Sequence, residues 1–297
     1  MKNDSFYTYH PVVNLGYFVS VIGFSMFFMH PVFLGISLFC GAVYALYIRG
    51  RSALRVGLLY MLPLVLITAV LNPLFNHQGA TILGYLRNGN PVTLESITFG
   101  IATAIMLVAV IIWFACFNMV MSGDKFVYLF GRVIPSLALV LSMAIAMVPK
   151  FRTQLGIIAN AQKTTSPHNK NRLHITTKAK NGIKILSILI TWALENSIQT
   201  ADSMKARGYG LKGRTAFSIY RFTSRDIYAL FFIAFCVVAI LIGASLGIYQ
   251  FRYFPTISGT WSGWALAIFV TYFALCFFPI TINIAEDIKW KHLQSKT

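Results

Sequence analysis

The sequence predicts an all-α protein: a polytopic membrane helix bundle of about six spans, joined to a cytoplasmic domain of long amphipathic helices. Apolar residues make up 57% of the 297 residues and charged residues only 11%, which exceeds the apolar content of ordinary globular domains. The positive charge is concentrated, because residues 122–226 contain 16 Lys and Arg against 4 Asp and Glu, a net +12 of the total +17. We therefore expect lipid to surround much of the chain and the basic segment to stay outside the lipid.

Six runs without a charged residue approach the roughly 20 residues that a helix needs to cross a bilayer. They cover residues 11–28, 31–48, 56–71, 98–121, 227–249 and 263–285. The run 56–71 is short and contains Pro63, so we expect a tilted or kinked helix there. No removable signal peptide is evident before the first run, which is expected to remain as an anchor.

The orientation follows from the positions of the cations, which favour the cytoplasmic side of a membrane. Cations cluster between the second and third runs, in the basic segment and near the end of the chain, at Arg49, Arg51, Arg55, Lys289, Lys291 and Lys296. All three clusters lie on one side if six spans cross the membrane. We therefore expect a multi-pass protein of the plasma membrane with both termini in the cytoplasm.

Two further apolar stretches, 126–149 and 183–199, could be read as two more spans. In that case residues 150–182, with seven Lys and Arg and no acid, would lie outside, against the usual charge bias. We interpret both stretches as long helices at the inner face of the membrane or against the bundle, with Pro135 and Pro149 bending or segmenting the first. The expected domains are 1–121 with four spans, 122–226 as the coupling domain, and 227–297 with two spans and a tail.

Within the basic segment, Leu155, Ile158 and Ala161 follow helical spacing, which predicts an amphipathic helix over 150–163. Residues 164–181 are polar and contain Pro167, which predicts an exposed loop. A second helix is expected from near Ile183 through Arg207.

The end of that second helix carries the strongest candidate site. Gly208 is expected to end the helix in a left-handed conformation. Arg207 then lies in the last turn beside the small residues Ala206 and Gly208, so its guanidinium is well placed for a carboxylate on a partner protein. The alternative is that Arg207 only complements the helix dipole.

The sequence lacks the residue patterns that metal binding, catalysis or nucleic-acid binding would require. The cysteines lie singly in apolar runs and no His or Cys spacing suits a metal, so we expect packing residues and no cofactor. No GxxxxGK[ST] phosphate loop and no set of catalytic residues occurs, so we expect neither an ATPase nor another enzyme. No nucleic-acid motif accompanies the basic segment, which is expected to face lipid headgroups and not nucleic acid. The polar residues of the spans are expected to form hydrogen bonds between helices; they are Asn14, Thr68, Thr103, Asn118 and Asn283.

The stretch Met204-Lys205-Ala206-Arg207-Gly208-Tyr209, followed by Arg214-Thr215, is similar to a motif of the transmembrane T component of energy-coupling factor transporters. The resemblance covers nearly the whole chain. It implies a non-catalytic subunit that links two ABC-type ATPases to a small substrate-binding membrane subunit, for uptake of a vitamin or a metal ion. It also implies that Ala206, Arg207 and Gly208 contact one ATPase, with Arg207 paired to acidic residues.

The family carries a second Ala-Arg-Gly tripeptide earlier in the chain, and this sequence departs from that pattern. Val148-Pro149 and Ala161-Gln162-Lys163 match the surroundings, but the tripeptide position reads Thr164-Thr165-Ser166. The candidate contact with the second ATPase is therefore Gln162, Lys163, Thr164 and Thr165. Either Lys163, Lys170 or Arg172 replaces the missing arginine, or the contact relies on backbone and packing.

Two other functions stay open. The permease subunit of a conventional ABC transporter also presents a cytoplasmic coupling helix, but lines the substrate path itself. A self-contained secondary transporter or channel would need no ATPase, and normally needs ionisable groups inside the membrane, which the six runs lack.

Overall fold

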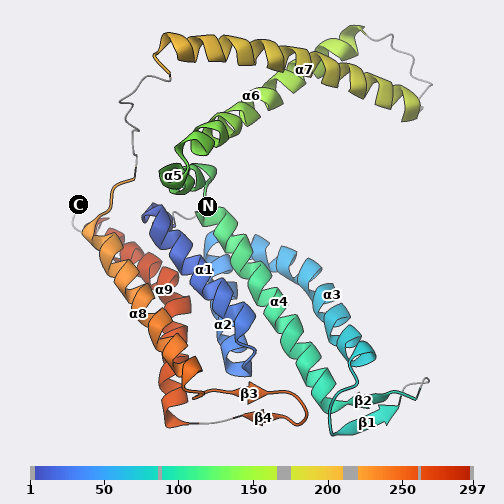
Figure 1. Cartoon of the computed structure of the whole chain (residues 1–297), viewed down its shortest axis with the longest axis vertical. Helices are drawn as coiled ribbons and strands as arrows, with labels where there is room; N and C mark the ends of the chain where they lie inside the picture. The colour runs from blue at the N-terminus through green and yellow to red at the C-terminus, as the bar shows by residue number, and fades with distance from the viewer. Residues whose placement is uncertain (1–3, 86–88, 166–174, 210–219, 260–261, 295–297) are drawn as a thin grey trace. The chain divides into compact units, whose positions relative to one another are not determined.

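The computed structural model describes residues 4–85, 89–165, 175–209, 220–259 and 262–294 (Figure 1). The chain forms two compact units. Unit 1 comprises Met1–Ser122 and Tyr220–Thr297, and unit 2 comprises Gly123–Ile219. The described residues are mostly α-helical, which confirms the all-α prediction.

The described residues of unit 1 form six α-helices, each of which corresponds to one of the predicted apolar runs. They are α1 (Pro11–Phe27), α2 (Pro31–Arg49), α3 (Arg51–Phe75), α4 (Leu94–Val120), α8 (Ser224–Ser245) and α9 (Gly263–Gln294). Among the described residues, α2, α4, α8 and α9 are long and apolar enough to cross a membrane, which indicates a membrane protein. Helix α1 is apolar but only 17 residues long, and the apolar part described in α3 is Met61–Phe75.

Short elements complete unit 1. A 3-10 helix, η1 (Ser5–Thr8), precedes α1. Two antiparallel hairpins follow α3 and α8: β1 (Ile82–Tyr85) with β2 (Pro91–Thr93), and β3 (Phe251–Arg252) with β4 (Ser258–Gly259). The hairpins lie at one end of the unit 1 helices and η1 at the other (Figure 1).

Local sequence explains how the first two helices begin. Each starts with a His-Pro pair, in which the histidine Nδ1 accepts a hydrogen bond from the backbone two residues later: His10 from Val12 (3.3 Å) and His30 from Val32 (3.2 Å). Proline at the first helical position has no N–H to leave unpaired, so the pair forms a complete cap. Helices α2 and α3 are separated by Gly50 alone, whose φ of 65° turns the chain.

The interior of unit 1 is aromatic. The largest fully buried side chains include Trp113, Tyr17, Tyr44 and Tyr272, with ring pairs mostly tilted or edge to face, as aromatic rings prefer. Helix α4 packs against α1, α2 and α3, while α9 packs against α2 and α8. The bundle therefore has a filled core.

The described part of unit 2 contains α5 (Gly123–Val133), α6 (Pro135–Thr165) and α7 (Ile175–Ala206). Pro135 begins α6 and so separates it from α5, whereas Pro149 lies within the continuous α6. Helices α6 and α7 cross where Phe151 meets Trp192 edge to face (5.7 Å between ring centroids) and Asn196 Nδ2 donates to Met147 Sδ (3.6 Å). The two apolar stretches 126–149 and 183–199 thus belong to unit 2 and not to the six-helix unit.

The predicted loop over 164–181 is partly wrong. Helix α7 begins at Ile175, eight residues before the predicted start, and residues 166–174 lie outside the described part of the chain. Residues 175–181 contain neither Gly nor Pro, and Lys and Ala are good helix formers, so the apolar helix can extend into this polar sequence.

Candidate docking site

The Met204–Tyr209 stretch forms a complete helix C-cap. Helix α7 ends at Ala206, and Gly208 has a φ of 79°, in the left-handed region. The Tyr209 N–H donates to the Met204 carbonyl (3.0 Å) and the Gly208 N–H donates to the Lys205 carbonyl (2.9 Å). This pair of hydrogen bonds is the Schellman motif, which glycine favours because it has no Cβ. The predicted role of Gly208 as the helix stop is confirmed.

Most side chains of the Met204–Tyr209 stretch are exposed on the surface of unit 2. Ala206 and Arg207 are exposed, and Tyr209 is 47% exposed. No carboxylate in the described part of the chain forms an ion pair with Arg207, while Lys205 occupies the last helical turn. The guanidinium of Arg207 can donate to a partner's carboxylate only if that group approaches closely, which the small neighbours Ala206 and Gly208 allow.

The second candidate contact lies at the C-terminal end of α6 in unit 2. Lys163 and Thr164 are exposed, Gln162 is half-buried, and α6 ends at Thr165, whose side chain lies outside the described set. Thr164 Oγ1 donates to the Ala161 carbonyl (2.7 Å), so its hydroxyl pairs with its own helix. Ser166, Lys170 and Arg172 lie outside the described residues.

The two helix ends are placed at equal distances from the crossing. Thr165 follows Phe151 by 14 residues, and Ala206 follows Trp192 by 14 residues. At 1.5 Å per residue each arm is about 21 Å long. The two ends lie on opposite sides of the crossing (Figure 1), so the structure keeps the two candidate contacts apart within unit 2.

Helix α7 also carries an apolar stripe on the face opposite α6. Its members recur every three or four residues and are 51–67% exposed: Ile183, Leu186, Ile190, Leu194 and Ile198. The residues that meet α6, Trp192 and Asn196, lie on the other face of the helix. We call these five residues the α7 stripe.

The interior of unit 1 contains a hydrogen-bond network that sequence reasoning missed. Ser25 Oγ and Ser37 Oγ are 2.6 Å apart, Tyr272 OH lies 3.2 Å from Ser25 Oγ, and Trp113 Nε1–H donates to Ser37 Oγ (3.0 Å). These four side chains are buried and join α1, α2, α4 and α9. Single Ser, Tyr and Trp residues in apolar runs give no sequence signal of their own, so only the packing reveals the network.

The polar residues named from the sequence behave differently. Thr68 and Thr103 donate to carbonyls of their own helices and Asn118 is exposed, so the prediction of bonds between helices is wrong for these three. Threonine can satisfy its hydroxyl on the preceding turn, which removes the need for a partner helix. Asn283 does reach another element, the segment before α1, and Asn14 Nδ2 donates to the Tyr9 carbonyl (3.4 Å).

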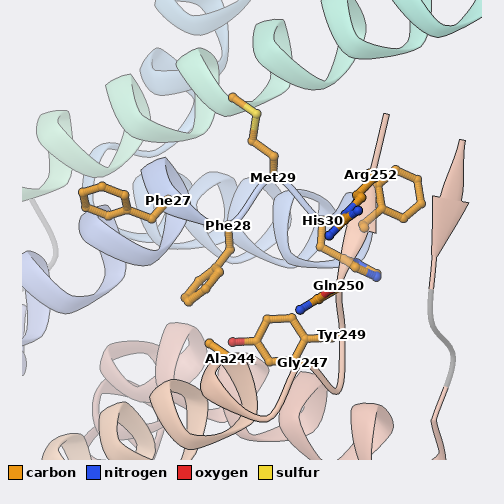
Figure 2. A pocket seen from close by; sticks show the side chains of 10 residues that line it. Phe27, Phe28, Met29, His30, Ala244, Gly247, Tyr249, Gln250 and Arg252 are labelled. Carbon is orange, nitrogen blue, oxygen red and sulfur yellow. The ribbon is translucent and has the colours of Figure 1, made fainter. Parts of the chain in front are cut away.

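A pocket of about 420 Å³ lies between the α1–α2 turn and the connection from α8 to β3 (Figure 2). Its walls are mainly aromatic, and its polar groups come from His30, Gln250 and Arg252. Tyr249, another wall residue, donates its hydroxyl proton to the Ile240 carbonyl (2.9 Å). The lining contains no Asp, Glu, Cys or Ser, and thus no pair of acid and nucleophile. Within the described residues no group of His, Cys, Asp or Glu could hold a metal ion.

No known protein family matches the chain, and no curated protein matches it either.

Proposed function

We propose that this chain is the transmembrane energy-coupling subunit of an importer of the energy-coupling factor type. It carries no catalytic site and transmits the movement of two ABC-type ATPases to a small substrate-binding membrane subunit, which takes up a vitamin or a metal ion. The observation that carries the proposal is the exposed Arg207 on the Schellman cap of α7, within Ala206-Arg207-Gly208.

The shape of unit 2 supports a coupling role. Two long crossed helices end in exposed, basic last turns, with Lys163 on α6 and Lys205 on α7. A force applied at either end acts on an arm of about 21 Å. The α7 stripe offers an apolar surface suited to a membrane partner or to lipid, because apolar side chains this exposed are poorly placed in water.

The filled core of unit 1 supports a scaffold and not a transport path. The described helices pack against one another through the aromatic core. They are also joined by the buried hydrogen-bond network of Ser25, Ser37, Trp113 and Tyr272. In this proposal the chain resides in the plasma membrane with both termini in the cytoplasm, where anionic headgroups attract the basic segment.

The first experiment is purification of the tagged chain from its native membrane in mild detergent, followed by identification of stoichiometric partners. Two ABC-type ATPase copies with a small membrane protein are expected. ATPases without that third protein would favour the permease subunit of a conventional ABC transporter. Recovery of the chain alone, together with transport by the purified chain in liposomes, would establish a self-contained transporter.

The matched test of the motif is Arg207→Glu against Lys205→Glu. Both variants change the charge of the same exposed helix end by the same amount, but only Arg207 lies between Ala206 and Gly208. Loss of an interfacial arginine leaves its carboxylate partner buried and unpaired, which costs about 2–5 kcal/mol of binding free energy. This cost corresponds to at least about 30-fold weaker ATPase binding. We expect Arg207→Glu to abolish uptake with normal membrane insertion and Lys205→Glu to retain most of it. Equal losses in both variants would show a general charge effect and contradict specific docking.

A further inference from the structure

The segment before α1 fastens three helices of unit 1 together at one end. Asp4 Oδ2 accepts a hydrogen bond from Tyr44 OH of α2 (2.9 Å), and Asp4 Oδ1 accepts one from Asn283 Nδ2 of α9 (2.7 Å). The Ser5 N–H donates to Asn283 Oδ1 (2.7 Å), and Phe6 is fully buried against aromatic rings of α1 and α9. We call residues 4–10 the N-terminal strap.

The other end of the strap holds the start of α8 through Asp226. The His10 N–H donates to Asp226 Oδ1 (3.0 Å), and the N–H and hydroxyl of Thr223 donate to Asp226 Oδ2 (2.9 and 2.6 Å). Asp226 is only 2% exposed, so these three donors replace the water that a carboxylate would otherwise require. The His10 ring also packs on Phe222, with 4.1 Å between ring centroids.

Arg225 adds a second, more exposed contact to the same place. Its guanidinium lies 4.6 Å from the centre of the Tyr9 ring and 3.6 Å from Glu286 of α9. The first turn of α8 is thus bound to the strap on two sides. Through the strap it is connected to α2 and α9.

The contact between the strap and the first turn of α8 lies close in sequence to one of the two junctions between the units. The backbone joins the two units at two places only, between Ser122 and Gly123 and between Ile219 and Tyr220. The second junction follows the Met204–Tyr209 stretch and leads within six residues from Tyr220 to Asp226. A pull that reaches unit 1 along this junction arrives at the first turn of α8.

We propose that the N-terminal strap positions the first turn of α8 so that displacement of unit 2 moves the whole bundle, with Asp226 as the positioning residue. Helix ends fray easily, and a loosely held first turn would absorb the displacement by unwinding. The strap prevents this because it joins that turn to α2 and α9. This inference rests on the proposed coupling function.

The test is Asp226→Asn in the complex purified with its ATPases and substrate-binding subunit and reconstituted in liposomes. The amide oxygen can accept hydrogen bonds but the NH2 group cannot, so either His10 or Thr223 loses its acceptor. We expect unchanged assembly and ATP hydrolysis, with uptake per ATP hydrolysed reduced about tenfold, the factor that one charge-assisted hydrogen bond is worth in an equilibrium. Glu286→Gln is the matched comparison, because it removes only the exposed ion pair with Arg225, and uptake per ATP should fall much less than in Asp226→Asn.

Two readouts separate positioning from a general folding defect. Hydrogen exchange on the chain alone should show faster exchange over 223–227 in Asp226→Asn while the centre of α8 stays protected. In the same variant, cysteines introduced at positions 10 and 222 and cross-linked after assembly should restore uptake per ATP, which a misfolded chain would not allow. If Asp226→Asn does not accumulate, Thr223→Val removes the hydroxyl donor alone and carries the same expectation.

Normal uptake per ATP in Asp226→Asn, with faster exchange over 223–227, would overturn the inference, because the turn would then be loose without effect. Failure of the cross-link to restore uptake would also overturn it. The proposed function fails separately, if Arg207→Glu still binds both ATPases and transports normally.

Discussion

At the scale of single residues, Gly208 combines a left-handed backbone with a place in the candidate docking site. Its φ of 79° costs an L-amino acid roughly 1–2 kcal/mol. We predict that Gly208→Ala loosens the C-cap, reorients Arg207 and weakens ATPase binding severalfold, measured by co-purification and by hydrogen exchange of amides 207–209.

Gly182→Ala is the control for this variant. Gly182 lies inside α7, and an added Cβ would meet no atom within 4 Å, so alanine there should stabilise the helix by about 0.5–1 kcal/mol. If both glycine variants bind the ATPases equally well, the left-handed cap is not needed for docking.

His30 gives a pH dependence that can be traced to one side chain. Burial lowers the pKa of His30 below its usual 6.5, and its ring lies among Phe33, Phe251 and Phe269. As the pH falls through the ordinary range of a histidine, the unfolded chain takes up a proton that the folded chain excludes. Stability therefore decreases as the pH is lowered below about 6.5.

The variant His30→Asn isolates this effect, because asparagine can still accept the Val32 N–H at the start of α2 without titrating. We predict a smaller loss of thermal stability for His30→Asn than for the natural chain between pH 7.5 and 5.5, measured in detergent by circular dichroism. Parallel curves for the two proteins would contradict it.

Residues close in sequence could be assigned from the sequence alone, and residues that meet across the fold could not. The cap at Gly208 depends on six consecutive residues, so its signal is local. The bond between His10 and Asp226 joins positions 216 residues apart. His10 belongs to a His-Pro helix start and Asp226 to a capping box with Thr223, but neither local motif predicts that the two residues meet. The strap therefore became visible only in the structure.

At the scale of elements, the apolar runs located the six helices of unit 1, because lipid-facing and core-facing positions are both apolar there. The predicted ends were less accurate. Helix α4 begins at Leu94, four residues before the run, because Glu95 lies in its first turn and a charge ended the predicted run. Helix α7 likewise begins before its predicted start, because charged and polar residues can occupy an exposed helix face.

The contact between α3 and α4 depends on a glycine. A Cβ added to Gly100 would lie 3.0 Å from the Ala69 carbonyl oxygen and 3.0 Å from Asn72 Cβ, and a backbone atom cannot easily move away. We predict that Gly100→Ala destabilises unit 1 by about 1–3 kcal/mol, measured by unfolding in detergent. Gly35→Ala, where an added Cβ meets no atom within 4 Å, should stabilise α2 by about 0.5–1 kcal/mol, as expected for Gly182→Ala in α7. Equal stability of Gly100→Ala and Gly35→Ala would contradict the close packing.

At the scale of the whole molecule, the chain combines a packed apolar unit with a basic unit of crossed helices, connected at two junctions. The two arms of unit 2 have equal length but different chemistry. The α7 end presents Arg207, whose planar guanidinium can pair with a carboxylate in two bonds, while the α6 end presents Lys163, a single flexible point charge. Under the proposed function, coupling is thus expected to be unequal at the two ATPases.

This inequality gives the last prediction. Lys163→Glu should weaken ATPase binding at most about fivefold, since an exposed lysine pair is worth up to about 1 kcal/mol, whereas Arg207→Glu should weaken it at least about 30-fold. The triple substitution T164A/T165R/S166G supplies the missing tripeptide at the α6 end. In the Arg207→Glu background it should restore part of the lost ATPase binding, because an arginine then tightens the second contact. The measurement is the binding stoichiometry and affinity of the purified ATPases. Equal losses in Lys163→Glu and Arg207→Glu, with no gain from the triple substitution, would show that α6 already docks as firmly as α7 without an arginine.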